Sequence, residues 1–371
     1  MASNAIINPD IFLPLLGRKM PGGTLCDPGG CSMDQFIDVQ KAIAPELQTV
    51  IQRRYMVLRA IAQLAPVGRR TLADVLKIGE RVIRTEVDVL KVLGLVEAGI
   101  GGVVLSKRGE DVFLALTPYV KEVLGLPRLE ELVGDALGIE RVIIVPGDSN
   151  RDPLVRRELG RAAARLLQKE LKNDDVVAIT GGTTMAYVAE MARTSRQKVT
   201  VVPGRGALGE RVEIQANTIA AQLAQALGGK YKLLHAPDNL SPQAMEELAR
   251  DQRIAEVLEL IRNASVLIHG IGDAQEMARR RDTRREQLAR LEDLGAVAEA
   301  FGYYFNAQGE IVWQVNSIGL RLSDLVGINM IIAVAGGADK ARAIRAVAAH
   351  HRQHILITDQ GAADALLNLS R

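Results

Sequence analysis

Aromatic residues, cysteines and long apolar runs are all scarce in this chain of 371 residues. Only 3% of the residues are aromatic, which argues against a surface that stacks on the bases of single-stranded nucleic acid. No apolar stretch reaches the length of about 18 residues that a membrane span requires, and the N-terminus lacks a basic-then-apolar secretory pattern. Two cysteines argue against a disulfide framework. We therefore expect a cytoplasmic protein that does not associate with a membrane.

The net charge of +2 conceals a local excess of positive charge. Between Glu46 and Glu110 there are 11 Lys and Arg residues against 7 Asp and Glu residues, and the rest of the chain is close to neutral. A basic excess confined to one small region suits contact with nucleic acid phosphates. The chain length favours two domains, and we expect their boundary near residues 125–126.

Residues 1–38 contain four prolines and two Gly-Gly pairs, so we expect a flexible N-terminal arm there. Cys26 and Cys31 lie in this arm. A structural zinc site needs four ligands, and no second pair of ligands is nearby. We therefore predict that these thiols are incidental and that the protein has neither a metal site nor a cofactor.

Residues 39–125 have the pattern of short helices followed by a hairpin. Apolar residues recur at helical spacing over residues 50–64, and Pro66 and Gly68 end that helix. Thr71 is expected to cap a short helix that ends at Leu76, and a third helix is expected over residues 80–93. Residues 96–106 suggest two strands around a glycine-rich turn, and a further helix is expected over residues 111–125. This order predicts a winged helix-turn-helix domain, joined by a linker helix over residues 127–137 to the remainder of the chain.

The third predicted helix carries polar residues on its first turns, away from its apolar face. In a helix-turn-helix domain these turns meet base edges in the major groove of double-stranded DNA. Arginine can pair with guanine through two hydrogen bonds or can hold a phosphate. The alternative is an ordinary helix with a solvated charged face. The predicted DNA contacts on and around this helix are Arg69, Arg70, Arg81, Arg84, Thr85 and Lys107.

Strand-length apolar runs alternate with helical patterns in residues 126–371. This alternation predicts a Rossmann-like α/β domain, in which helices cover both faces of a parallel sheet. One segment, residues 296–312, instead suggests an antiparallel hairpin with a turn at residues 308–309. The predicted strands span residues 141–145, 176–179, 199–202, 231–235, 265–269, 330–335 and 354–357. The predicted helices include residues 153–171, 215–227, 241–261 and 339–351.

A glycine-rich turn follows the second of these strands and opens a helix. Gly181 and Gly182 let the backbone approach an anion, while Thr183 and Thr184 add hydroxyl donors. The first amide groups of the helix point outward and carry the positive end of the helix dipole. The pattern therefore predicts a phosphate site. The alternative is a simple turn in which threonine caps the helix.

Other predicted strands also end in glycine-rich loops that carry cations. Arg205 follows one strand, and Gly336, Gly337 and Lys340 follow another. Because loops at the carboxyl ends of parallel strands share one crevice, we expect these residues to meet there. Residues 269–273 resemble a dinucleotide fingerprint, but Gln275 replaces the third glycine, so we do not predict nicotinamide binding. The histidines at 350, 351 and 354 are expected to form a solvated or dipole-facing cluster rather than a metal site.

The motifs, in this order, resemble those of the SorC/DeoR family of bacterial transcription regulators. They include GRRTL at residues 68–72, GERVIR at 79–84, GGTTM at 181–185, VPGRG at 202–206, HGIG at 269–272 and AGG at 335–337. The resemblance extends from about residue 40 to the C-terminus. It implies a sugar-binding domain related in fold to glucosamine-6-phosphate deaminase and ribose-5-phosphate isomerase.

Within the family, the chain is most similar to the branch that represses central glycolytic genes and whose effector is fructose 1,6-bisphosphate. This resemblance implies that Thr183, Thr184 and Arg205 hold one phosphate, and that Arg280 and Lys340 hold the other. It also implies that Glu299 accepts sugar hydroxyls. The effector contacts expected from the motifs and the resemblance together are Gly181, Gly182, Thr183, Thr184, Arg205, Arg280, Glu299, Gly336, Gly337 and Lys340.

The resemblance further implies a homodimer or homotetramer that binds operator DNA and that the effector loosens. Two alternatives remain: a regulator of the same family with a different sugar-phosphate effector, and a sugar-phosphate isomerase or deaminase. An isomerase needs a placed base. Asp273 and Glu299 are the only candidates near the loops, and neither has an evident partner in the sequence. We therefore expect no catalytic residues and no enzyme activity.

Overall fold

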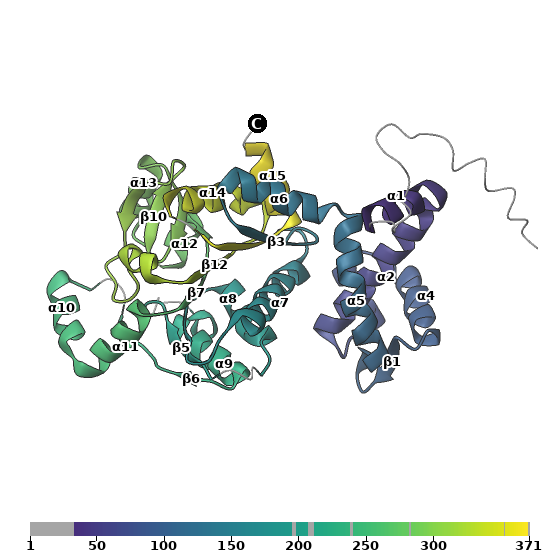
Figure 1. Cartoon of the computed structure of the whole chain (residues 1–371), viewed down its shortest axis with the longest axis horizontal. Helices are drawn as coiled ribbons and strands as arrows, with labels where there is room; N and C mark the ends of the chain where they lie inside the picture. Colours follow the sequence, from purple (N-terminus) through teal and green to yellow (C-terminus); the bar gives the residue numbers. More distant parts are fainter. Residues whose placement is uncertain are drawn as a thin grey trace, which may run out of the picture. The chain divides into compact units, whose positions relative to one another are not determined.

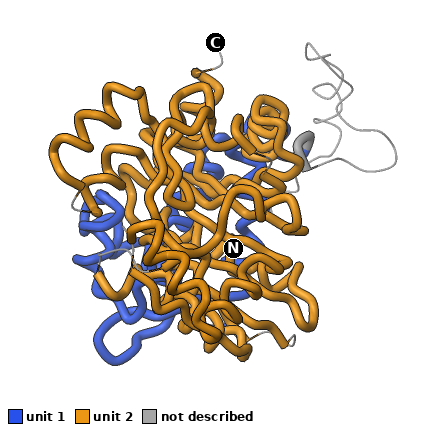
Figure 2. Tube along the Cα trace, turned by 90° about the vertical axis from the view of Figure 1, so that its left-hand side faces the viewer, with its two compact units in different colours: residues 1–124 blue, residues 125–371 orange. Residues whose placement is uncertain are grey.

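The computed structural model describes residues 33–194, 198–206, 211–237, 240–281, 283–351 and 353–369. The chain divides into two compact units, Met1–Leu124 and Gly125–Arg371 (Figure 2). Within the described ranges, every helix is too short or too polar to span a bilayer. Both cysteines and most of the predicted flexible arm lie outside the described residues, so that prediction stays untested for residues 1–32.

The first unit contains five helices and one hairpin among its described residues (Figure 1). The elements are α1 (Met33–Ile43), α2 (Pro45–Leu64), α3 (Arg69–Leu76), α4 (Glu80–Val92), β1 (Val96–Gly99), β2 (Gly102–Leu105) and α5 (Lys107–Val123). Helix α1 begins inside the segment that the sequence assigns to the arm. The reason is packing: Ile37 of α1 is buried, and Tyr119 of α5 donates a hydrogen bond to Gln40.

Two helix starts in the first unit differ from the predictions. Helix α3 is capped by Gly68 rather than by Thr71, and the Leu72 N–H donates to the Gly68 carbonyl at 3.0 Å. Helix α5 begins at Lys107 because the Ser106 hydroxyl accepts a hydrogen bond from the Gly109 N–H at 3.0 Å. Lys107 therefore lies on the first turn of a helix, not in a loop after the hairpin.

A buried ion pair holds α4 against α2. Glu86 on α4 is only 6% exposed, and its carboxylate accepts hydrogen bonds from Arg53 at 3.3 Å and Arg54 at 3.1 Å. Ile83 and Leu90, about one turn before and after Glu86 on the same helix, are fully buried in the apolar core. The opposite face of α4 is left exposed.

A seven-stranded parallel sheet forms the centre of the second unit, in the order β3-β13-β12-β7-β4-β5-β6. Because all neighbouring strands pair in parallel, the strand carboxyl ends lie along one edge. The strands are β3 (Arg141–Val145), β4 (Val176–Ile179), β5 (Thr200–Pro203), β6 (Lys230–Tyr231), β7 (Val266–Gly270), β12 (Met330–Val334) and β13 (Ile355–Asp359).

Helices cover both faces of this sheet (Figure 1). Alternate residues of β4, Val177 and Ile179, face a core that they share with three helices: α7 (Pro153–Glu170), α8 (Thr183–Met191) and α9 (Ala216–Leu227). The other face is covered by α6 (Leu126–Leu137), α11 (Gln252–Arg262) and α15 (Gln360–Leu369), with η4 (Ala338–Lys340) and α14 (Ala341–His350) packed against α15. Burial of the sheet on both faces matches the continuous apolar runs of the sequence.

A second, antiparallel sheet of four strands packs beside α12 and α14, in the order β11-β10-β9-β8. Its elements and the helices next to it are β8 (Gly272–Asp273), α12 (Ala274–Arg280), α13 (Arg285–Asp293), β9 (Ala296–Ala300), β10 (Tyr303–Asn306) and β11 (Ile311–Gln314). The predicted hairpin over residues 296–312 is therefore three strands with two turns.

Two other predictions for the second unit are wrong. The strand predicted over 231–235 is only the short β6, whose two residues are exposed. The helix predicted over 241–261 is two helices, α10 (Pro242–Arg250) and α11, which meet at Asp251. The Asp251 carboxylate accepts hydrogen bonds from the Arg253 and Ile254 N–H groups, so it caps the second helix and ends the first.

The carboxylate of Asp359 ties together three segments at the carboxyl edge of the parallel sheet. It is fully buried at the end of β13 and accepts three backbone N–H bonds of 2.8 Å each, from Ser149, Gly337 and Ala362. A Cβ atom on Gly336 would lie 2.6 Å from the Asp359 Oδ2 atom, so only glycine at this position lets the loop after β12 come this close to Asp359. Asp359 thus fixes the loops after β3 and β12 to each other.

We predict that Asp359→Asn destabilises the second unit by about 3 kcal/mol, because hydrogen bonds to a buried charge are individually strong and the amide cannot accept all three. Denaturant unfolding measures this effect. Asp251→Asn is the matched control, since Asp251 also accepts backbone N–H bonds but at an exposed helix start. There we expect a loss of about 1 kcal/mol or less. Equal losses at the two positions would contradict the anchoring role of Asp359.

Candidate functional site

A pocket of about 340 Å³ lies at the carboxyl edge of the parallel sheet. Loops after β3, β4, β5, β7 and β12 contribute to it, together with α12, β9 and η4. Nine of the ten expected effector contacts line this pocket: Gly181, Gly182, Thr183, Thr184, Arg205, Arg280, Glu299, Gly336 and Lys340. The tenth, Gly337, is not part of the lining, and its N–H donates to Asp359.

The loop after β4 presents the start of α8 to the pocket. Gly182 caps the helix with a φ of 117°, a conformation that favours glycine. The Gly182 N–H donates to the Ile214 carbonyl at 2.8 Å, which fixes the loop against η2 (Val212–Ile214). The first amide groups of a helix have no acceptor within the helix, so those of Thr183 and Thr184 can bind an anion, as can the two hydroxyls. The local structure therefore has the form of a phosphate cradle.

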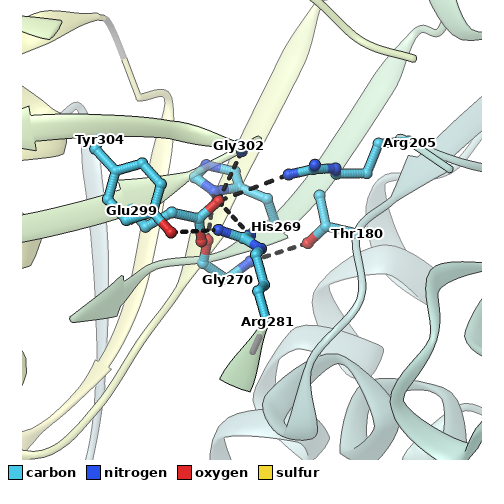
Figure 3. A network of polar contacts seen from close by, with 8 residues as sticks. All are labelled: Thr180, Arg205, His269, Gly270, Arg281, Glu299, Gly302 and Tyr304. Atoms are coloured by element: carbon cyan, nitrogen blue, oxygen red, sulfur yellow. Dashed lines mark hydrogen bonds and ion pairs between the residues drawn. The ribbon is translucent and has the colours of Figure 1, made fainter. Parts of the chain in front are cut away.

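A buried ion cluster forms one wall of the pocket (Figure 3). The Glu299 carboxylate on β9 accepts a hydrogen bond of 2.8 Å from Arg281 and one of 2.6 Å from the Gly302 N–H, and it lies 3.8 Å from the Arg205 guanidinium. Arg281 also donates to the Tyr304 hydroxyl at 2.8 Å. The three charged side chains are 5–6% exposed, so the cluster is shielded from water.

Electrostatics keep Glu299 ionised in this buried position. Burial by itself raises the pKa of Glu299, but the guanidinium groups of Arg281 and Arg205 outweigh it and lower that pKa below its usual range. Burial lowers the pKa of Arg281, but Glu299 and Tyr304 raise it above its usual value. Two cations and one carboxylate therefore leave one net positive charge in the wall of the pocket.

The turn between β9 and β10 brings this cluster into place. Phe301 and Gly302 form the two-residue loop, and both have positive φ values, 56° and 85°. A Cβ atom on Gly302 would lie 2.4 Å from the Arg205 Nη1 atom, so glycine is required where the guanidinium passes. The Phe301 ring lines the pocket and packs on His269, with the ring centroids 4.3 Å apart. A left-handed backbone at a non-glycine residue is uncommon and often marks a functional position.

The structure corrects the expectation that Glu299 and Asp273 have no partners. Glu299 is held by Arg281, Arg205 and Gly302, and the Asp273 side chain caps α12 by accepting from the Glu276 N–H at 3.0 Å. Arg281 was missed in the sequence because it belongs to the run Arg279-Arg280-Arg281, in which nothing distinguishes the inward-facing member. The end of α12 makes that distinction: Arg279 and Arg280 are exposed, whereas Arg281 turns inward.

A second ion cluster also lines the pocket, on α12 and η4. Glu276 on α12 accepts one hydrogen bond of 2.5 Å from Lys340 on η4 and another of 2.5 Å from Arg280. The Lys340 side chain is 15% exposed, and that of Glu276 is 42% exposed. Burial raises the pKa of Glu276, but Lys340 and Arg280 lower it below its usual range. Further lining residues that the sequence did not single out are Ser149, Asn150, Arg156, Glu276, Arg281, Phe301 and Asp339.

The histidines near the pocket differ in exposure: His350 at the end of α14 is exposed, as expected for a solvated cluster, whereas His351 is half-buried. His269 is fully buried, and its Nε2 atom lies 3.0 Å from the side-chain oxygen of Gln353, whose amide nitrogen lies 2.6 Å from the His351 Nε2 atom. Burial lowers the pKa of His351 to about 3, with smaller effects from His269 and His350. Burial also lowers the pKa of His269. Both rings are therefore neutral at physiological pH.

We predict that the second unit loses stability as the pH falls. His351 in the unfolded chain takes up a proton below about pH 6.5, whereas in the folded protein it stays neutral down to about pH 3. The unfolded state therefore binds more protons in this range, and acid favours unfolding. His351→Gln, which keeps a hydrogen-bond acceptor for Gln353, should give a melting temperature that falls less steeply between about pH 7 and about pH 5.

His235→Gln serves as the control for this experiment, because His235 is exposed. It should follow the wild-type pH dependence. If His351→Gln also followed it, His351 would not be the group that takes up the proton on unfolding.

The predicted DNA contacts occupy the exposed face of α4 and its surroundings. Arg81, Arg84 and Thr85 are exposed on the first turns of α4. Arg69 on α3 pairs with Asp88 on α4 at 2.7 Å, and Lys107 pairs with Asp111 at 3.1 Å. The remaining predicted contact, Arg70, lies 3.9 Å from Glu80. Three of the six predicted cationic or polar contacts thus share their charge with a nearby carboxylate, a feature that the sequence pattern does not reveal.

Comparisons with known proteins define the class of this chain. Residues 50–120 match the CggR N-terminal DNA-binding domain family, and residues 121–368 match a sugar-binding domain family. The chain is 39% identical to a SorC family transcriptional regulator from Enterococcus faecalis, whose structure superposes with a TM-score of 0.62 over 65% of this chain and 99% of that one. It thus joins a DNA-binding domain to a sugar-binding domain of the SorC type, as transcriptional regulators do.

The most similar relatives include two proteins with the same name. The central glycolytic genes regulators of Bacillus subtilis and Priestia megaterium are each 44% identical to it, over 90% of this chain and 99% of their own length. The chain belongs to the central glycolytic genes regulator family. The full-length sorbitol operon regulator SorC from Klebsiella pneumoniae, at 16% identity and a TM-score of 0.61 over 85% of this chain and 98% of its own, shares the fold.

Proposed function

We propose that this protein represses central glycolytic genes and that fructose 1,6-bisphosphate, bound in the pocket of the second unit, controls its binding to operator DNA. The observation that carries the proposal is the pocket itself. It combines an anion-binding helix start with cations from four separate segments: Arg156 on α7, Arg205 after β5, Arg280 and Arg281 at the end of α12, and Lys340 on η4. The names of the relatives support the target genes.

A bisphosphate suits this arrangement better than a monophosphate. The start of α8, with Thr183 and Thr184, offers amide and hydroxyl donors to one phosphate, next to the net positive charge of the Arg205–Glu299–Arg281 cluster. Arg280 and Lys340 offer charge-assisted hydrogen bonds to the other phosphate. A monophosphate would meet only one of these two groups of donors, so it would gain fewer charge-assisted hydrogen bonds than a bisphosphate.

The first unit has the features of a winged helix-turn-helix domain, with α4 as recognition helix and the β1–β2 hairpin as wing. Helices α3 and α4 are joined by a tight turn at Lys77, whose φ is 55°. The buried Glu86 fixes α4 to α2, so its exposed face is presented on a rigid support. By analogy with other two-fold symmetric DNA-binding proteins, the chain acts as a homodimer or homotetramer on a symmetric operator.

We predict that fructose 1,6-bisphosphate raises the melting temperature of the second unit more than fructose 6-phosphate at the same concentration, because tighter binding to the folded state stabilises it more. Lys340→Ala should reduce the bisphosphate affinity by about tenfold or more, measured by calorimetry. Lys232→Ala, which removes an exposed lysine outside the pocket, is the matched control.

Equal stabilisation by both sugars would argue for a single phosphate subsite and for a different sugar-phosphate effector. Absence of any stabilisation by phosphorylated sugars would refute the proposed role of the pocket.

For the first unit, we predict that Arg84→Ala weakens binding to operator DNA by about tenfold or more and lowers the salt dependence of that binding. Fluorescence anisotropy at several salt concentrations measures both effects. Arg250→Ala, which removes an exposed arginine on α10, should change neither. If the two variants bound DNA with the same affinity, α4 would not be the recognition helix.

A further inference from the structure

Glu276 occupies the position that an anionic ligand of the pocket would need. Its carboxylate joins the two cations of one ion cluster, Lys340 and Arg280, with hydrogen bonds of 2.5 Å each. Lys340 belongs to η4 and Glu276 to α12, so the contact closes the pocket by joining two separate elements. Among the residues that the structure describes, no other carboxylate pairs with either cation.

The charges of the pocket show why this contact matters. Among the described lining residues there are five cationic side chains and three carboxylates, Glu276, Glu299 and Asp339. Glu299 is fully buried and fixed by its own partners, so an incoming ligand cannot replace it. Glu276 is 42% exposed, and ion pairs of partly exposed groups are weak enough to exchange. Of the two paired carboxylates, only Glu276 is therefore replaceable.

We propose that Glu276 is a built-in competitor for the effector: a ligand phosphate binds by displacing the Glu276 carboxylate from Lys340 and Arg280, which replaces the direct contact between α12 and η4 with a contact through the ligand. This inference rests on the proposed function of the pocket and adds to it a selection step and a trigger. A neutral sugar has no charge to offer Lys340 and Arg280 in exchange, so it leaves Glu276 in place. A phosphorylated sugar supplies charge and acceptors of its own.

Displacement of Glu276 changes how α12 is held against η4. Helix α12 packs against β9, which carries Glu299, and it leads into α13. With Glu276 bound, α12 is tied to η4 across the pocket; with phosphate bound, Lys340 and Arg280 face the ligand instead. A ligand shifts a conformational equilibrium only through its differential affinity for the two states, and the exchange of partners at Lys340 supplies that difference.

The test compares three variants of the full chain, with calorimetric titration of fructose 1,6-bisphosphate and of inorganic phosphate. Glu276→Gln removes the competing charge. Glu276→Asp keeps the charge but withdraws it by the length of one carbon–carbon bond, about 1.5 Å, which breaks the contact with Lys340. Glu246→Gln is the matched control, since Glu246 also pairs with an arginine four residues later, but on the exposed helix α10. Thermal unfolding without ligand confirms that each variant is folded.

We expect both Glu276 variants to bind the ligands about tenfold more tightly than the wild type, which corresponds to ~1.4 kcal/mol, and Glu246→Gln to be unchanged. Tighter binding by Glu276→Gln alone would mean that the carboxylate acts only through its charge, and it would overturn the displacement. Unchanged or weaker binding by both variants would mean that Glu276 holds the cations in place for the ligand, which also overturns it. Absence of wild-type binding to either ligand would instead refute the phosphate pocket, and with it the proposed function.

Discussion

The pocket depends on one buried carboxylate. Glu299 lies on the small antiparallel sheet, while its partners come from the loop after β5 (Arg205) and from the end of α12 (Arg281). Removing charged groups from water costs several kcal/mol each unless they are paired and hydrogen-bonded, so the three side chains hold their elements together in one arrangement. The cluster contains two cations and one anion. After these groups pair, one positive charge remains in the wall of the pocket. The same contacts thus account for both the assembly of the two sheets and the positive charge in the wall of the pocket.

Sequence periodicity predicted the central sheet well because its strands are covered on both faces. Continuous apolar runs such as residues 176–179 and 266–268 have few other stable arrangements. The failures occurred where tertiary contacts outweigh local pattern. The apolar residues after Tyr231 belong to a loop beyond a two-residue edge strand, and the helical periodicity over 241–261 hides a break that depends on a single capping aspartate. Helix α1 begins early because Ile37 is buried, which composition alone does not disclose.

The candidate site followed from topology and resemblance more than from any single residue. Parallel strands bring their carboxyl ends to one edge, so glycine-rich loops far apart in sequence line one pocket. Pairing inside that pocket was not predictable in the same way. Arg281 is distinguished from Arg280 only by the end of α12, and Glu276 meets Lys340 from 64 residues away. His351 illustrates the same limit, since its partial burial depends on contact with Phe301, which lies in a turn of the other sheet.

The order of strands in the parallel sheet determines how late in synthesis the pocket of the second unit can form. Strand β3, the first of this sheet in the sequence, pairs only with β13, the last of the described strands, and Asp359 at the end of β13 fixes the loop after β3. During synthesis, the helices and hairpin of the first unit are therefore complete long before the pocket can close. Contacts between the ends of a domain form slowly because a long loop must be closed first. A newly made chain passes through an interval in which its DNA-binding unit is already formed and its ligand pocket is not.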